Sequence, residues 1–470
     1  MTTLGAAELE SLQTISRPYS AKVIAMNARD SRTRTFLKSA SLIKERELDA
    51  VVSSFLFVVV LMSAYYILRP VRDAMASDWT DAEVSWLWTL NFFISTGVVA
   101  LYGAAVSRFR FRLLVPATYG IFAASFVSFY ALGFVYADGT LIDKSFYVWV
   151  SVFSLFHISV FWSFMSELFS KEQAGRLFGI IAAGASVGGL VGPSVPAFFT
   201  GSLGTDNLML IASVMLLLTM PIIFHLQTLK LTAPNERIFA TTPPEETIGG
   251  TSLAGFKLFF SNPYLLCIAL FIFLYTGVSS FVYFELKNLL SELARQERTA
   301  IWAQMDLAVN ILSISTGLLV TGRIVSKFGM PVTIALIPLA ICFGLLVLAI
   351  SPILGAVVVV QIVRRAGNYA VTRPAREMLF TRVDRETRFK AKPVIDIVAY
   401  RGSDMLMAWL FTGLTQGLGL GLAAVAMVGA AIAALWSLVG IYLGRWFERD
   451  DVELEVSAES APSGSRKNAQ

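Results

Sequence analysis

Arginine side chains stand inside or directly beside long apolar stretches of this sequence. Arg69 and Arg72, in "YYILRPVRD", follow one apolar run, and residues 373–377, "RPARE", nearly repeat that pattern. Arg364 and Arg365 lie within another apolar run. A guanidinium group stays charged in a low-dielectric cavity and holds two phosphate oxygens in fork geometry. The pattern therefore predicts a binding site for a phosphate-bearing anion.

Arg364 lies near the middle of its apolar stretch. If a helix starts near Pro352, Arg364 lies roughly 18 Å along the helix axis, at 1.5 Å per residue. A charge at the centre of a bilayer costs several kcal/mol, so such a residue usually faces a cavity or a partner. A structural salt bridge to a neighbouring helix is the alternative, but two adjacent arginines favour a cavity. The polar stripe on this helix consists of Gln361, Arg364, Arg365, Asn368 and Thr372.

Arg69, Arg72 and Asp73 share one helix face, at i, i+3, i+4 spacing. Snorkelling of both arginines to the membrane interface would also explain them. Glu285 stands 216 residues after Arg69, so internal pseudo-symmetry would place an acid opposite a base as an outer gate. An interfacial Glu285 beside Lys287 explains the same spacing.

The segment after the tenth predicted helix, "RPAREMLFTRVDRETRFKAKPVIDIVAYRGSD", is strongly basic. Such a segment serves membrane topology and attracts anionic lipid headgroups. Binding to nucleic acid is not expected, because no binding module is present. Asp396, Tyr400 and Asp404 recur at helical spacing and suggest that the segment also lines a path.

The composition indicates an integral membrane protein. Apolar residues make up 56% of the chain, charged residues 15%, and the mean hydropathy is +0.66. Cys267 and Cys342 lie in apolar segments and only two histidines occur, so neither a disulfide framework nor a metal site is expected. His157 is expected to pack rather than carry protons. With no nucleophile–base pair in view, we expect a protein without cofactor that is not an enzyme.

Twelve apolar stretches have the length of helices that cross about 30 Å of hydrocarbon. With the N-terminus inside, the cytoplasmic segments hold 32 Lys and Arg residues and the external ones 6. The positive-inside rule then predicts that both termini are cytoplasmic, in a bacterial inner membrane. The predicted spans are 50–68, 83–105, 113–136, 146–165, 177–200, 208–225, 263–285, 305–325, 331–352, 353–379, 394–421 and 422–444.

Two similar halves are expected. "GAAVSRF" at 103–109 matches "GRIVSKF" at 322–328, each after the second helix of its half. Parallel six-helix repeats with a substrate site between them are typical of the major facilitator type, which predicts an all-α membrane protein of two pseudo-symmetric halves. The predicted parts are a cytoplasmic tail (1–47), a six-helix half (48–225), a cytoplasmic linker (226–262), a second half (263–445) and a cytoplasmic tail (446–470).

The stretch "GIIAAGASVGGLVGP" at 179–193 places Gly184, Gly188 and Gly192 on one helix face, where they allow close helix packing. Its pattern G-x8-G-x3-G-P also resembles the fifth-helix signature of facilitator-type antiporters. The loop pattern after the second helix resembles that superfamily's motif, although Ser107 and Ser326 stand where Asp is usual.

The charged motifs together resemble a family. "ILRPVRDAM", "FWSFMSELFSKEQAGRLFG" and the basic segment after the tenth helix are similar to motifs of the ATP/ADP exchange translocases of intracellular bacteria and plastids. The resemblance implies counter-exchange of nucleotides without ATP hydrolysis. It also implies that the family's charged positions are taken by Arg69, Arg72, Glu285, Arg376, Glu377 and Lys392. There are departures, because Arg72 and Arg376 stand where Lys is usual and the Trp-Lys after the seventh-helix Glu is missing.

The predicted site and partners follow from both lines of reasoning. The expected partners are a small anion, most simply a nucleotide, and the lipid bilayer. The carrier is expected to be a monomer. A proton-coupled exporter of drugs or organic anions is the alternative. The expected substrate-binding residues are Arg69, Arg72, Arg364, Arg365, Asn368, Arg373, Arg376 and Lys392, and the expected gating or coupling residues are Asp73, Glu285, Asp306, Glu377 and Asp396.

We expect Arg364→Gln to abolish exchange while the protein still folds, because the variant loses the central positive charge. Counterflow in proteoliposomes measures exchange, and size-exclusion chromatography checks folding. Counterflow at the wild-type rate would refute the role of Arg364.

Overall fold

The structure, a computed structural model, describes residues 44–108, 111–136, 139–232, 259–319, 321–383, 395 and 400–460. Most of the predicted N-terminal tail and linker, together with Lys392 and Asp396, lies outside the described residues. The described residues are almost entirely helical, which confirms the all-α fold class.

The first half contains six long helices. They are α2 (Leu48–Met75), preceded by the short η1 (Glu45–Glu47) and followed by η2 (Ala76–Asp78), then α3 (Asp81–Arg108), α4 (Phe111–Val135), α5 (Thr140–Leu168), α6 (Lys171–Leu203) and α7 (Asn207–Thr232).

The second half follows the same order with two interrupted helices. Its elements are α9 (Pro263–Leu290), α10 (Arg295–Leu319), α11 (Thr321–Ile350), α12 (Leu354–Gly367), η3 (Asn368–Thr372), α13 (Arg373–Leu379), η4 (Phe380–Arg382), α15 (Tyr400–Thr412), η6 (Gly413–Gly417) and α16 (Leu422–Ser460).

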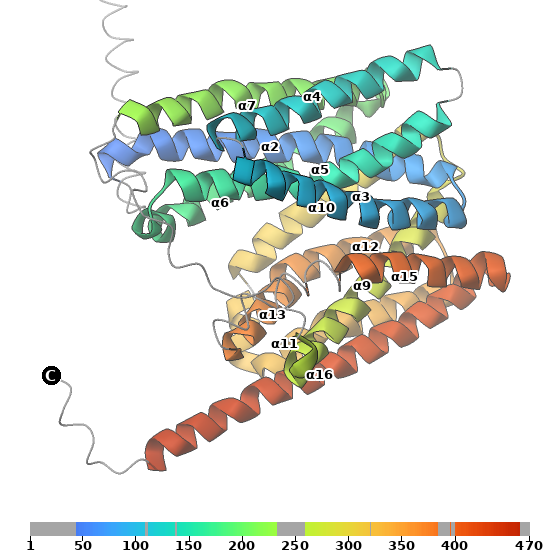
Figure 1. The fold of residues 1–470 in the computed structure, drawn as a ribbon. Coiled ribbons are helices and arrows are strands. Elements are labelled where there is room, and N and C mark those ends of the chain that lie inside the picture. Colours follow the sequence, from blue (N-terminus) through green and yellow to red (C-terminus); the bar gives the residue numbers. More distant parts are fainter. Residues whose placement is uncertain are drawn as a thin grey trace, which may run out of the picture.

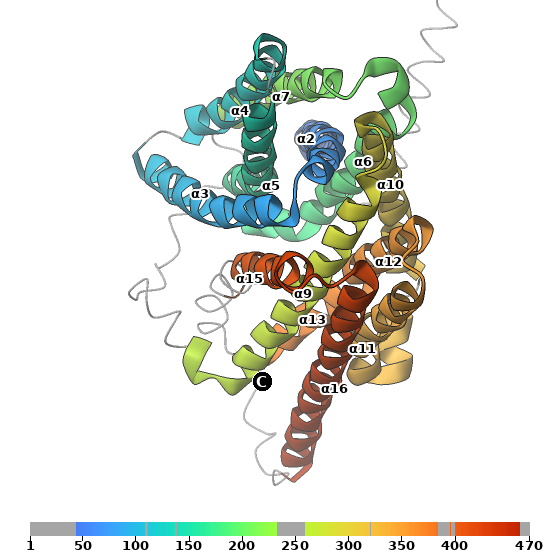
Figure 2. The same cartoon turned by 90° about the vertical axis from the view of Figure 1, so that its right-hand side faces the viewer.

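The helices form two groups that correspond to the two halves of the sequence (Figures 1 and 2). The halves meet where α10 packs on α6 and α2, and where α15 packs on α3. Each half also has its own core, for example α2 against α6 and α7, and α11 against α16. Residues far apart in sequence are therefore brought together along the seam between two compact bundles.

Eight helices of the described chain are long and apolar enough to span a membrane. Segments that fall short of that criterion include α10, which carries several charged residues, and α12 and α15, which are short because π-helical turns follow them. Each predicted apolar stretch nevertheless overlaps a helix or a helix with its π-helical extension. Eight of the twelve predicted spans are thus confirmed by length and hydropathy, and the other four stay predictions.

The π-helical turn η3 interrupts the helix that carries Arg364. It covers Asn368–Thr372 and ends just before Pro374, at the start of α13. Proline lacks a backbone N–H and its ring clashes with the carbonyl four residues earlier, so it disturbs the regular hydrogen bonding of the helical turn before it. The wider turn accommodates the proline, and such turns often lie beside functional sites.

Two predicted boundaries differ from the structure. The first span was expected to end at residue 68, but α2 continues to Met75, so Arg69 and Arg72 lie within the helix. The predicted tail from residue 446 begins as a continuation of α16, which ends at Ser460. Both differences arise because a helix continues through polar residues once its apolar part is packed.

The N-terminal end of α2, which is predicted to face the cytoplasm, is joined to α6 by hydrogen bonds. Ser170 and Gln173 form a capping box at the start of α6. Gln173 and Arg176 both donate hydrogen bonds to Glu47, at 3.0 and 2.9 Å. Although burial raises the pKa of Glu47, these hydrogen bonds outweigh it and hold that pKa below its usual value.

The glycine face of α6 lies directly against α2. A Cβ atom built on Gly188 would lie 2.5 Å from the carbonyl oxygen of Val59, and one on Gly192 would lie 2.7 Å from that of Ser63. No side chain larger than hydrogen fits without moving backbone. The expected role of these glycines in packing is confirmed.

We expect Gly188→Ala to destabilise the protein by about 1–3 kcal/mol, because the methyl group overpacks the contact between α2 and α6. Thermal unfolding of purified protein measures the loss. Gly179→Ala, in the same helix, is the matched control, since nothing lies within 4 Å of its Cβ position. Equal stability of the two variants would contradict the close-packing explanation.

Candidate functional site

A cavity of about 220 Å³ lies between the halves. Its walls come from helices of both halves, so a ligand bound there contacts both. The lining residues are Arg69, Arg72 and Asp73 of α2, Trp88, Asn91 and Phe92 of α3, Tyr147 and Ser151 of α5, Ser279 and Tyr283 of α9, Trp302 of α10, Gln361 and Arg364 of α12, and Arg401 and Asp404 of α15.

The charges of α2 are paired with one another. Arg72 donates to Asp73 at 2.6 Å and lies over the ring of Tyr147, 5.6 Å from its centroid. Arg69 lies 3.6 Å from the other oxygen of Asp73. Asp73 is only 2% exposed, whereas both arginines are partly exposed to the cavity. One buried carboxylate therefore orients two guanidinium groups at the wall.

Asp306 connects three helices through charge. It lies 3.5 Å from Arg69 of the first half and 2.5 Å from Arg365 of α12. Asp306 and Arg365 are both almost fully buried. A buried charge requires a partner to be tolerated, and here one carboxylate serves two arginines. The pair between Arg69 and Asp306 is an ionic contact between the halves inside the protein.

Arg364 differs from its neighbour Arg365. Its guanidinium donates twice to the amide oxygen of Gln361, at 3.0 and 2.7 Å, and lies over the ring of Tyr275. It is 4% exposed, and within the described part of the chain no carboxylate pairs with it. Arg364 therefore brings a full positive charge to the cavity with only neutral groups as direct partners.

The cavity lining carries a net positive charge. Four guanidinium groups, including that of Arg401, face two carboxylates, those of Asp73 and Asp404, which leaves a formal charge of +2. Arg401 lies 3.9 Å from Asp404, a loose pair. The lining thus favours an anion over a cation or a neutral solute of the same size.

Aromatic side chains of both halves form the rest of the wall. The indole N–H of Trp88 donates to the hydroxyl of Tyr147 at 2.7 Å, and that hydroxyl lies 3.2 Å from the hydroxyl of Tyr283. Trp302 packs against Tyr283, with ring centroids 5.5 Å apart. These rings form the wall of the cavity beside the guanidinium groups, and Tyr147, Tyr283 and Trp302 among them are almost fully buried.

Ion pairs hold the halves together at one end of the molecule, which we call the closed end. Asp78 accepts hydrogen bonds from Arg295 and Arg298, both at 2.6 Å, and Arg295 also pairs with Asp143 at 2.8 Å. Asp78 and Asp143 belong to the first half, and both arginines belong to α10.

A second, more buried contact lies beside this network at the closed end. Lys287 of α9 donates to Asp81 of α3 at 2.9 Å and to the carbonyl oxygen of Trp79 at 2.7 Å. Thr415 of η6 donates to the other oxygen of Asp81. Lys287 is 1% exposed, so this contact lies inside the seam between the halves.

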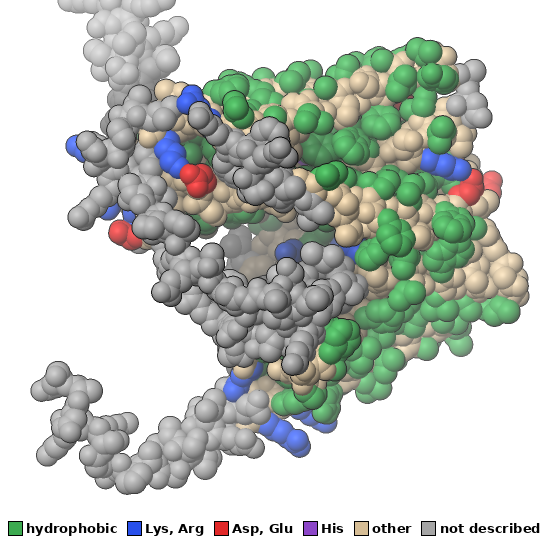
Figure 3. Space-filling view, viewed as in Figure 1, with side chains coloured by type: hydrophobic (Ala, Val, Ile, Leu, Met, Phe, Trp, Pro, Cys, Tyr) green, Lys and Arg blue, Asp and Glu red, His purple; other side chains and the backbone are tan. Residues whose placement is uncertain are grey.

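The opposite side of the seam is hollowed. Figure 3 shows a hollow between the two halves, with Lys or Arg side chains in view inside it. The ion pairs of Arg295 with Asp78 and Asp143 lie toward the right-hand end in Figure 1. The connections from α2 to α3 and from α4 to α5 lie at the same end. The described structure is therefore closed at one end of the seam.

The structure places the other expected site residues away from the cavity lining. Asn368 is buried in η3, and Arg373 is exposed at the start of α13. Arg376 donates to the hydroxyl of Tyr400 at 2.8 Å and lies 3.3 Å from Glu377. These residues stay predictions as substrate contacts.

Glu285 does not form the expected pair with Arg69. Its side chain is 2% exposed, and one carboxylate oxygen has no hydrogen-bond partner in the described structure. The partners of Arg69 are Asp73 and Asp306 instead. The alternative explanation paired an interfacial Glu285 with a nearby Lys287. In the structure, Lys287 forms an ion pair with Asp81.

Several lining residues were not found by sequence reasoning. Trp88, Tyr147, Tyr283 and Ser279 face the cavity, yet in an apolar helix their types do not differ from those of packing residues. The spacing of these residues along the sequence shows no pattern that indicates a binding site. His157 stacks on Tyr65, with ring centroids 4.4 Å apart, in the manner of the expected packing residue.

No group of three or more metal-ligating side chains occurs among the described residues. The arrangement holds charges and rings around a small space, with a seam that opens toward one side. A cavity between two helix bundles is typical of multi-pass membrane transporters.

Comparison with known families agrees with this class. The profile of the Major Facilitator Superfamily matches residues 54–376, and the chain belongs to that superfamily. It is thus a secondary transporter rather than an enzyme. A comparison with curated proteins finds no match to the chain.

Solved structures share the fold at low sequence identity. The crystal structure of a point mutant of the nucleoside transporter NupG is similar with a TM-score of 0.59 and 11% identity, over 85% of this chain and 100% of that one. A bacterial homologue of the human lysosomal transporter Spinster, inward-facing and unoccupied, gives a TM-score of 0.54 at 14% identity, over 87% and 99%. Its occupied form gives 0.55 at 13% identity, over the same shares of the two chains.

We expect Asp306→Asn to destabilise the fold by about 3–5 kcal/mol, because it leaves the buried Arg365 without its counter-charge. The double variant Asp306→Asn, Arg365→Gln should regain part of that loss, since the orphaned charge is then removed as well. Thermal unfolding of the purified variants measures both changes. Asp404→Asn is the control, as its pair with Arg401 is long and partly exposed.

If the double variant is no more stable than Asp306→Asn alone, the two residues are not energetically coupled.

Proposed function

We propose that this protein exchanges phosphate-bearing organic anions across a membrane, with nucleotides as the leading candidates, by alternating access of the central cavity. The observation that carries the proposal is Arg364, a buried guanidinium at the cavity with neutral hydrogen-bond partners only. An anionic solute supplies the negative charge that this side chain lacks.

The arginines of the first half complete the proposed binding site. Arg72 keeps one face toward the cavity while Asp73 holds its Nε and one terminal nitrogen. The remaining terminal nitrogen is 3.4 Å from the hydroxyl of Ser151, a long contact that a phosphate oxygen can replace. Arg72 and Arg364 would then hold the anion from opposite halves.

The aromatic walls suit the other part of a nucleotide. Stacking of a base on an aromatic ring is worth about 1–3 kcal/mol. Trp88 offers a partly exposed ring, and the almost fully buried rings of Tyr147, Tyr283 and Trp302 become available when the cavity widens. One structure of similar fold is that of a nucleoside transporter, which is consistent with such a solute. At 220 Å³ the cavity is below the range of about 300–1,000 Å³ for drug-sized ligands, so a nucleotide requires it to widen on binding.

Resident carboxylates support exchange over net leak. Asp73 and Asp306 neutralise Arg69, Arg72 and Arg365 in part. The empty carrier is thus held by its own ion pairs, including the pair of Arg69 and Asp306 across the halves. A bound anion competes with Asp306 for Arg69 and weakens that contact, which links solute binding to movement of the halves.

Orientation in the membrane is part of the proposal. The excess of Lys and Arg in the predicted internal segments supports an orientation with both termini in the cytoplasm of a bacterial cell. The closed end then faces outward, and the described state is the one that loads from the cytoplasm.

A proton-coupled exporter is the second candidate. Glu285 favours it, because a buried carboxyl group with an unbonded oxygen and no basic partner in the described structure is suited to hold a proton. The glycine signature of α6 resembles that of facilitator-type antiporters.

Counterflow in proteoliposomes distinguishes the candidates. We expect labelled nucleotide to enter only vesicles preloaded with a nucleotide or another phosphate ester, and an imposed pH gradient to change the initial rate little. Nucleotides, sugar phosphates and inorganic phosphate form the panel, and empty liposomes are the control. Uptake driven by the pH gradient without internal substrate would favour the exporter and contradict the exchange proposal.

A further inference from the structure

A second cavity, larger than the central one, lies at the closed end. Its volume is about 400 Å³, within the range of pockets that hold drug-sized ligands. It lies between α4, α5 and α7 of the first half, and its lining shares no residue with the central cavity. We call it the end pocket.

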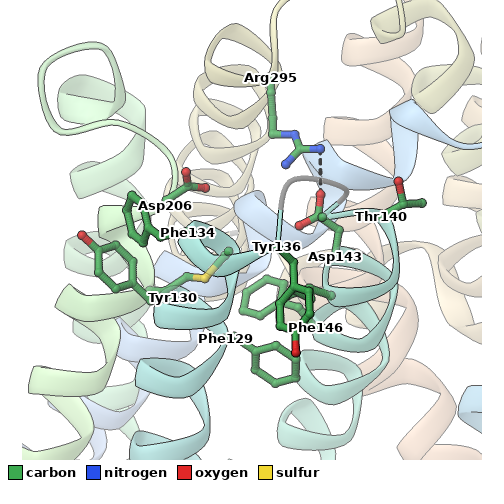
Figure 4. A pocket seen from close by; sticks show the side chains of 13 residues that line it. Phe129, Tyr130, Phe134, Tyr136, Thr140, Asp143, Phe146, Asp206 and Arg295 are labelled. Atoms are coloured by element: carbon green, nitrogen blue, oxygen red, sulfur yellow. Dashed lines mark ion pairs between the residues drawn. The ribbon is translucent and has the colours of Figure 1, made fainter.

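Aromatic rings form much of the wall of the end pocket. Phe129, Tyr130 and Phe134 belong to α4, and Tyr136 directly follows the end of that helix. Phe146 belongs to α5. Figure 4 shows the rings of Phe129 and Phe146 across the pocket from the charged groups. Aromatic faces carry negative potential and attract organic cations within about 6 Å of the ring centre.

The charges of the end pocket are mostly negative. Its lining contains the carboxylates of Asp143 and Asp206 and the guanidinium of Arg295. Arg295 is already shared by Asp143 at 2.8 Å and Asp78 at 2.6 Å. Asp206 is exposed, and no basic side chain of the described structure pairs with it. The lining thus has a formal charge of −1, opposite in sign to that of the central cavity.

We propose that the end pocket binds an organic ammonium ion, with Asp206 facing the cationic nitrogen and the aromatic rings covering its hydrocarbon part. The central cavity, with its formal charge of +2, does not suit such a cation, so the ligand of the end pocket is not the transported solute. Two sources share this chemistry: a free amine from solution, and the ammonium headgroup of a lipid such as phosphatidylethanolamine.

The end pocket depends on contact between the halves. All its lining residues belong to the first half except Arg295, the first residue of α10. Arg295 is also part of the ion-pair network of the closed end. A ligand in the end pocket therefore contacts both halves and stabilises the closed end, which slows a carrier that must open there.

Equilibrium binding of benzyltrimethylammonium to the purified full chain tests the proposal, with benzyl alcohol as the neutral comparator. We expect the wild type in phosphatidylglycerol nanodiscs to bind the cation and not the alcohol. Asp206→Asn should weaken binding about fivefold, the size of one partly exposed ion pair, and Tyr136→Leu should weaken it through loss of a ring.

Matched variants keep this test independent of the transport proposal. Glu167→Gln removes one exposed carboxylate far along α5 from the end pocket and should bind the cation like the wild type. Arg364→Gln should also bind it normally, whatever its transport activity. Absence of binding, equal effects of Asp206→Asn and Glu167→Gln, or loss of binding in Arg364→Gln would each overturn the proposal.

The lipid composition of the nanodisc separates the two sources. If phosphatidylethanolamine nanodiscs suppress binding of the free cation while phosphatidylglycerol nanodiscs preserve it, a lipid headgroup occupies the end pocket. If both bind equally, the ligand is a free amine. In either case, external benzyltrimethylammonium should slow counterflow without competing with the transported solute, and competitive inhibition would contradict a separate site.

Discussion

A guanidinium group inside an apolar helix bundle needs negative charge nearby, and the arrangement of this protein follows from how that need is met. Asp73 and Asp306 serve Arg69, Arg72 and Arg365, so those arginines are held in place by the protein itself. Arg364 receives an amide oxygen and an aromatic ring instead. Positive charge is thus neutralised where helices pack and left over at the cavity.

The same need explains why the halves meet through polar contacts. Asp306 and Arg69 cross the seam inside the protein, and Asp78 and Asp81 cross it at the closed end. Within the first half, the glycine face of α6 packs directly against the backbone of α2. Close apolar packing has no alternative arrangement of similar energy, whereas an ion pair in the seam can exchange its partner for a solute or for water. Rigid halves joined by exchangeable contacts are what a rocking carrier requires.

The number of segments and the polar stripe on α12 could be predicted from the sequence, because hydrocarbon thickness sets helix length and burial makes charge rare. The partners of the charges could not. Periodicity predicts which residues share a face of a helix, but not which neighbouring helix packs on that face. The pairing of Arg365 with Asp306 was therefore missed, and Glu285 was assigned to Arg69 through pseudo-symmetry. Arg373 was expected to bind substrate with Arg364, but the π-helical turn between them changes the register of the residues that follow. The aromatic residues of the cavity wall cannot be distinguished by type from the other aromatic residues of a chain with 35 Phe, 14 Tyr and 9 Trp.

The two indoles of the cavity wall have an optical consequence. Trp88 belongs to the first half and Trp302 to the second, and both stand close to Tyr283. Tryptophan emission depends on local polarity and on nearby quenching groups, so these two side chains respond to water entry, to a bound chromophore and to any change in the distance between the bundles. The protein carries an intrinsic fluorescent label on each side of its own seam.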